Sequence, residues 1–199
     1  MMNPFFRSVV TASLMLGSVL PAFAACAVPE GIRLSDTDKD RISSLAEARS
    51  RGLAQALRAT SAADRDLVAG LLSTAPSRPA LETLPGDYRC RTIKLGGITD
   101  LTVYGWFRCA IRAEGDALSV VKLTGSQNFT GALHAGGEGV LMVGAGHYNQ
   151  DPPNGYGDDP ERDIVGCLAA LGEAGTLVLE EPFPRFESVH DLIVFEPIR

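Results

Sequence analysis

The feature that most constrains the fold is a series of eight short β-rich runs after Pro85-Gly86. Glycine-bearing turns near residues 115, 136 and 173 separate several of these runs. Even spacing with tight turns favours antiparallel strands that pair with their neighbours in the sequence. We therefore predict strands at 87–95, 102–112, 118–126, 128–134, 139–148, 163–171, 175–181 and 188–196.

Eight consecutive antiparallel strands are the right number to close into a small up-and-down barrel, because closure removes the exposed edges. Glycines at 105, 131, 144 and 146 suit the tight bends of a curled sheet. We therefore predict a mainly β protein of the α+β type, with an eight-stranded antiparallel barrel over residues 85–199. An open β-sandwich is the alternative fold.

A helical period precedes the strands, from about Asp36 to Thr74. Apolar residues between Ile42 and Leu57 recur at spacings of three and four, which predicts one amphipathic helix. Ser61-Ala-Ala-Asp64 is a variant of the capping box and predicts the start of a second, shorter helix. Residues 25–84 are therefore expected to form a helical segment with a helical pair.

The first residues are typical of a secretory signal. A short apolar run follows Arg7, and Ala22 and Ala24 occupy the two positions that a signal peptidase reads. We therefore predict that residues 1–24 are a signal peptide and that the protein is periplasmic or secreted. Removing them takes away one arginine and no acid, so the formal charge of −6 becomes −7. This charge argues against nucleic acid as a partner, and no remaining stretch is apolar and long enough to span a membrane.

Four cysteines in an exported chain predict two disulfides, for which three pairings exist. Cys90 and Cys109 lie in similar alternating contexts, so we favour a Cys90–Cys109 bridge and a Cys26–Cys167 bridge. Residues 23–26 also distantly resemble a lipoprotein box. The alternative is thus a lipid anchor on Cys26, which would leave Cys167 as a free thiol.

If the strands alternate up and down, the long connections, among them 149–162, all lie at one end of the barrel. Long loops on a rigid scaffold commonly carry binding sites. Aromatic side chains on the strands and this loop are candidate ligand contacts, although interior residues of a small barrel can also fill it. The candidates are Tyr88, Trp106, Phe107, Tyr148 and Tyr156.

Two histidines and several acids are expected near the same end. Imidazole and carboxylate ligands suit zinc with an open position, and the acids of 151–163 offer oxygens for calcium. No motif spacing ties these residues together, so we predict no resident cofactor and keep zinc or calcium as alternatives. The candidate metal ligands are His147, Asp151, Asp163 and His190.

These observations predict a non-enzymatic binding barrel for a small hydrophobic ligand or an envelope protein partner. The alternative is a metal-dependent or carboxylate-based hydrolase centred on the rim loop 149–162.

Several motifs also resemble a family of secreted alphaproteobacterial proteins, the domain of unknown function 4893. The resemblance covers most of the chain, including the helices between Asp38 and Leu72. It implies an exported envelope protein of a Gram-negative bacterium and implies no reaction. The motifs are Gly86-Asp-Tyr-Arg-Cys-Arg-Thr-Ile-Lys-Leu-Gly96, Tyr104-Gly-Trp-Phe-Arg-Cys109, Leu123-Thr-Gly-Ser-Gln127, Asp151-Pro-Pro153 and Pro184-Arg-Phe-Glu-Ser-Val-His-Asp191.

Overall fold

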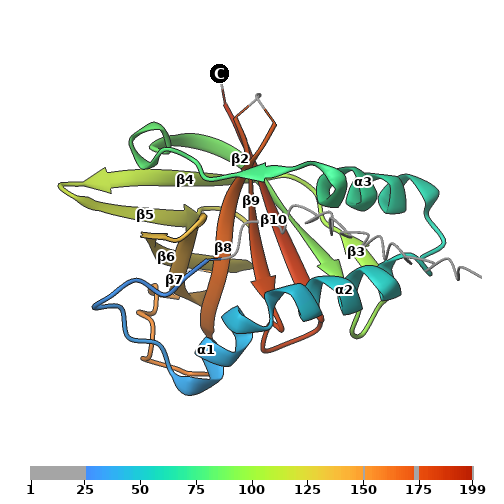
Figure 1. Cartoon of the computed structure of the whole chain (residues 1–199), viewed down its shortest axis with the longest axis horizontal. Helices are drawn as coiled ribbons and strands as arrows, with labels where there is room; N and C mark the ends of the chain where they lie inside the picture. Colours follow the sequence, from blue (N-terminus) through green and yellow to red (C-terminus); the bar gives the residue numbers. More distant parts are fainter. Residues whose placement is uncertain (1–25, 150, 173–174, 199) are drawn as a thin grey trace, which may run out of the picture.

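The structure is a computed structural model that describes residues 26–149, 151–172 and 175–198 (Figure 1). The predicted signal peptide, residues 1–24, lies outside the described residues. No helix within those ranges is long and apolar enough to cross a membrane.

Within the described residues, eight antiparallel strands close into a barrel, which confirms the predicted fold class. Each barrel strand pairs with the next along the chain, and the last strand pairs with the first. The connections therefore alternate between the two ends. The barrel strands are β2 (Gly86–Leu95), β4 (Phe107–Glu114), β5 (Ala117–Lys122), β6 (Gln127–Gly136), β7 (Gly139–Tyr148), β8 (Asp163–Leu171), β9 (Thr176–Pro182) and β10 (His190–Pro197).

The expected strand at 102–112 is instead split into β3 (Leu101–Val103) and β4, which pair with successive parts of β2. Gly105 lies between them, and a glycine weakens a strand because it has no side chain to pack. Two further short elements were not predicted. They are β1 (Pro76–Ser77), which pairs with β8, and the 3-10 helix η1 (Leu81–Thr83).

The first predicted helix is divided in two at Ser44, giving α1 (Asp36–Ser43) and α2 (Leu45–Ala56). The Ser44 N–H bonds to the carbonyls of Asp40 and Arg41, which tightens the chain there. The second predicted helix is present as α3 (Ala62–Ser73), and its cap Ser61 accepts from the Asp64 N–H as expected. Figure 1 shows α1 and α2 lying across the outside of the barrel, where they contact β8, β9 and β10.

Buried ionic contacts join α2 to the outer face of the barrel. Arg49 donates to both carboxylate oxygens of Glu180, each at 2.8 Å, and His190 Nε2 lies 3.0 Å from Glu180 Oε2. Gly52 allows the helix to come close, because a Cβ built there would lie 2.9 Å from that of His190. The helix therefore packs directly onto β9 and β10.

Arg41 joins α1 to the end of the barrel that carries the long loops. Its guanidinium donates to Asp38 Oδ1 and to Glu181 Oε1, both at 2.9 Å. It also donates to the carbonyl oxygens of Pro182 and Asp163. This buried arginine thus connects α1, β8 and β9.

The two predicted disulfides are both present, Cys26–Cys167 on the outer face of β8 and Cys90–Cys109 between β2 and β4 inside the barrel. A sulfur in a disulfide has no free valence for the thioether of a lipid anchor, so the two uses of Cys26 exclude each other. Two disulfides are compatible with an oxidising, extracytoplasmic compartment.

We expect Gly97→Ala to destabilise the fold much more than Gly31→Ala. Both glycines have positive φ, +93° and +87°, so an alanine at either costs about 1–2 kcal/mol in backbone strain. Only at Gly97 would the new Cβ also meet backbone, 2.1 Å from the Glu187 carbonyl oxygen, whereas Gly31 has nothing within 4 Å. Urea denaturation of both variants measures the difference. Equal losses would show that the loops at 97 and 187 are not locked together.

Candidate functional site

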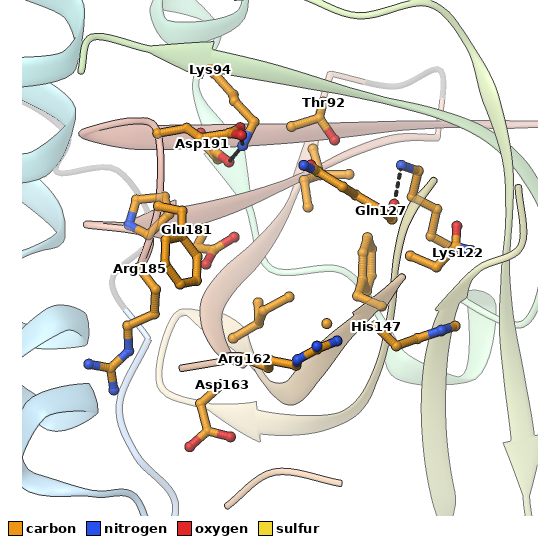
Figure 2. Close-up of a pocket in the computed structure, with 18 of the residues that line it drawn as sticks. Thr92, Lys94, Lys122, Gln127, His147, Arg162, Asp163, Glu181, Arg185 and Asp191 are labelled. Atoms are coloured by element: carbon orange, nitrogen blue, oxygen red, sulfur yellow. Dashed lines mark hydrogen bonds and ion pairs between the residues drawn. The ribbon is translucent and has the colours of Figure 1, made fainter. Parts of the chain in front are cut away.

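The barrel contains a cavity of about 360 Å³ at the end where the long loops lie (Figure 2). Its walls come from six barrel strands, namely β2 and β6–β10, together with Lys122 at the end of β5. The segment between β9 and β10, including Arg185 and Glu187, completes the rim. The cavity is therefore the unfilled end of the barrel interior.

The other half of the barrel is filled by large apolar side chains, among them Tyr88, Ile111, Leu168 and Phe195. Successive residues of a strand point to opposite faces, so Thr92 and Lys94 lie on the same inward face of β2 as Tyr88. The interior thus changes from apolar to polar along its axis. Phe129, Ile164 and Ile193 line the cavity and mark this boundary.

Two buried carboxylates face each other on adjacent strands of the wall. Asp191 on β10 pairs in register with Glu181 on β9 and, on its other side, with Lys94 on β2. Lys94 Nζ lies 3.6 Å from Asp191 Oδ2 and 2.8 Å from Glu187 Oε2, and Glu181 accepts from Arg41. The row is shown at the left of Figure 2.

The pKa values of both carboxyls are raised. Burial, and then the neighbouring charge of Asp191, raise the pKa of Glu181 to about 7. Burial likewise raises the pKa of Asp191 above its ordinary range. Glu181, which lines the cavity, therefore changes its protonation near neutral pH.

Lys122 lies on the opposite wall. Its side chain is buried, and Nζ donates to the Gln127 carbonyl at 2.6 Å and lies 4.2 Å from the Phe107 ring centroid. Burial, and then repulsion from Lys94, lower the pKa of Lys122 to about 8. Among the described residues, no carboxylate forms an ion pair with this lysine.

The predicted aromatic residues do not line a single site. Tyr148 lines the cavity and stacks under Arg162, and Phe107 lies beneath Lys122. Tyr88 packs in the filled half, with its ring edge-to-face on Phe195 and its hydroxyl donating to the Leu84 carbonyl.

The other two aromatics lie away from the cavity. Trp106 contacts the guanidiniums of Arg89 and Arg91, which lie 4.6 and 4.4 Å from its ring centroid. Tyr156 donates to Asp38 and accepts from the Ser35 N–H, which ties the rim loop to the start of α1.

The predicted metal ligands are also apart. His190 is covered by α2, while Figure 2 shows His147 pointing away from the cavity centre. Asp163 lines the cavity, and Asp151 is exposed in the rim loop. In the described part of the chain, no three His, Cys, Asp or Glu side chains are grouped to hold a metal ion.

The acids of the rim loop bond to the loop's own backbone. Asp158 Oδ2 accepts from the Gly155 N–H at 2.7 Å, and Asp163 Oδ1 accepts from the Gly157 N–H at 2.8 Å. Asp159 Oδ1 accepts from the Glu161 N–H at 3.1 Å. These are the local side-chain bonds that fix turns, so these three carboxylates shape the loop.

The sequence interpretation placed Asp191 near this end of the barrel but did not single out Lys94, Lys122 or Glu181. One signal was available, because strict alternation places Lys94 on the same face as Tyr88 and Cys90. A charged residue at an inward position of a predicted strand indicates either a polar cavity or a wrong register.

Comparison with protein families gives one match, to the family described as Domain of unknown function (DUF4893), over residues 32–195. The chain belongs to this family. No curated protein and no solved structure matches the chain. The DUF4893 match spans α1 to β10, so it includes every wall of the cavity.

We expect Glu181→Gln to become more stable, relative to the wild type, as the pH rises. The folded state binds the Glu181 proton more tightly than the unfolded chain, so the wild type loses stability between pH 4.5 and about 7. The neutral amide avoids that loss, which amounts to at most about 3 kcal/mol. Urea denaturation at several pH values between 4 and 8 measures it.

Glu180→Gln is the matched control and should show the opposite trend. Burial opposes its ionisation, but hydrogen bonds from His190 and Arg49 prevail and lower the pKa of Glu180. The ionised Glu180 therefore stabilises the folded protein above its ordinary pKa, and this stabilisation is lost as the pH falls. Parallel pH profiles for the two variants would contradict this assignment.

Proposed function

We propose that this DUF4893 protein binds a small amphipathic molecule in the open end of its barrel. The observation that carries the proposal is the cavity of about 360 Å³, which falls within the range of small-molecule sites. A closed barrel holds such a cavity open without help from a ligand. This supports a binding role that needs no chemical step.

The lining favours a ligand with both an apolar and a polar part, rather than a purely hydrophobic one. Phe129, Ile164 and Ile193 offer apolar surface at the inner end, while Lys94, Lys122 and the carboxylates carry charge along the walls. A wholly apolar ligand would leave these buried charges desolvated without new partners, which costs free energy.

We further propose that the chain is exported to the cell envelope. The two disulfides are compatible with that compartment, and residues 1–24 have the layout of a signal peptide. A protein recovered from the envelope fraction that begins at Ala25 would support export.

Hydrolysis by carboxylates is the rival proposal, because a carboxyl with a pKa near 7 suits proton transfer at neutral pH. Mass spectrometry of a co-purified ligand separates the two functions. Recovery of the ligand unchanged after incubation supports binding. Cleavage that wild-type protein performs and Glu181→Gln does not would support hydrolysis instead.

We expect Gly146→Leu to abolish ligand binding by filling the cavity. Gly146 lines it, and a Cβ there meets only ordinary contacts of 3.6 Å or more. The neutral fluorescent probe N-phenyl-1-naphthylamine should bind the wild type saturably, and its Kd should rise at least about tenfold in the variant, a loss of about 1.4 kcal/mol.

Gly105→Leu is the matched control, because Gly105 is exposed and has nothing within 4 Å. Its Kd should equal that of the wild type. Native mass spectrometry of the three proteins should show a co-purified species on the wild type and on Gly105→Leu alone. Equal probe binding by all three proteins would overturn the proposed site.

A further inference from the structure

We propose that the ligand is a small organic anion whose acidic group is bound by the ammonium of Lys122. Its apolar part would lie on Phe129, Ile164 and Ile193 at the inner end of the cavity. The inference rests on the proposed binding function and specifies the chemical class of the ligand.

Lys122 is placed to donate to a ligand. Its side chain lines the cavity, and the residue is 7% exposed. A lysine ammonium carries three N–H donors, and one of them is used by the Gln127 carbonyl, as Figure 2 shows. The ammonium also lies 4.2 Å from the Phe107 ring centroid, and its other donors have no hydrogen-bond partner among the described residues.

The charge of Lys122 also lacks a counterion. Each of the other lining cations has a carboxylate close by: Lys94 has Glu187 at 2.8 Å, Arg162 has Asp159 at 3.3 Å and Arg185 has Asp38 at 3.7 Å. Among the lining cations of the described chain, Lys122 alone has no such partner. A buried charge is costly unless it is paired.

An anion beside Lys122 would relieve both effects that act on it. Burial disfavours the ammonium, and Lys94 repels it. A ligand carboxylate or sulfonate would replace the missing solvent and offset the repulsion from Lys94. An anion therefore gains an interaction with Lys122 that a neutral molecule in the same cavity cannot make.

The rest of the lining restricts which anion fits. Glu181 and Asp191 lie on the other walls and would repel a second negative charge. The apolar inner end offers no donors to a fully hydrated ion. These features favour a singly charged organic acid over inorganic phosphate.

The test compares two fluorescent probes that differ by one anionic group. 8-Anilinonaphthalene-1-sulfonate carries a sulfonate, and N-phenyl-1-naphthylamine is its neutral counterpart. Lys122→Met keeps a chain of similar length without the charge. We expect the Kd of the sulfonate probe to rise about 10- to 100-fold, the range for loss of a hydrogen bond to a charged group. The Kd of the neutral probe should change less than about threefold.

Lys39→Met is the matched control, because Lys39 is an exposed lysine on α1 that is paired with Asp36. It should leave both Kd values unchanged. Thermal melts of the two variants establish that each is folded. Sodium octanoate should displace the sulfonate probe from the wild type, and inorganic phosphate at the same concentration should not.

The outcomes separate this inference from the proposed function. If neither probe binds, or if Gly146→Leu leaves both affinities unchanged, the binding function itself is wrong. If both probes bind and Gly146→Leu prevents it, but Lys122→Met affects them equally, then only the assignment of the anion to Lys122 is wrong. Displacement by phosphate in place of octanoate would contradict the organic part of the ligand.

Discussion

The ladder between β2 and β10 joins the first and last strands of the barrel, from His190 opposite Leu95 to Pro197 opposite Tyr88. Closure leaves no free barrel edge, and every second side chain of each strand points into the same interior. Eight strands make that interior just wide enough for side chains to fill it. Tyr88 and Phe195, which meet edge-to-face from these two strands, show how one half is filled. The inward side chains at the other end of the strands then determine whether that end is filled or contains a cavity.

At the hollow end the interior positions carry charges instead of hydrocarbon. Lys94, Asp191 and Glu181 form a row across three strands, and Arg41 continues it to α1. Such groups cannot be packed tightly like leucines, because each requires partners or water. The row therefore keeps the interior of this half of the barrel from being filled by packed side chains. It also ties α1 to the rim through a buried ion pair, whose loss on one side would leave an uncompensated charge.

Most barrel strands and the Cys90–Cys109 disulfide could be predicted because a period of two and regular turns are local signals. Cys26–Cys167 spans 141 residues and followed only as the remaining pair. The same alternation placed Lys94 inside, but a lone lysine among apolar residues reads more easily as a solvent-facing position. Its partner Asp191 lies far along the chain, as does Arg41 from Glu181, and no local pattern reports contacts of that range. Trp106 illustrates the reverse case. Its aromatic side chain suggested a ligand contact, whereas it packs against two arginines on the barrel exterior.

The rim loop shows why the richest cluster of polar residues in a sequence need not be the reactive one. Asp158, Asp159 and Asp163 accept hydrogen bonds from backbone N–H groups of the loop, and Tyr156 fixes it to Asp38. Their polar atoms are used to hold a conformation. The charged side chains on the strands differ, because they are shielded from bulk solvent and line the cavity. Burial and the neighbouring Asp191 raise the pKa of Glu181 to about 7, and such shifted carboxyls are common at functional sites. The charges of this end of the barrel therefore come from inward positions of β2, β5, β9 and β10, while the loop adds Glu161 and Arg162 to the cavity lining.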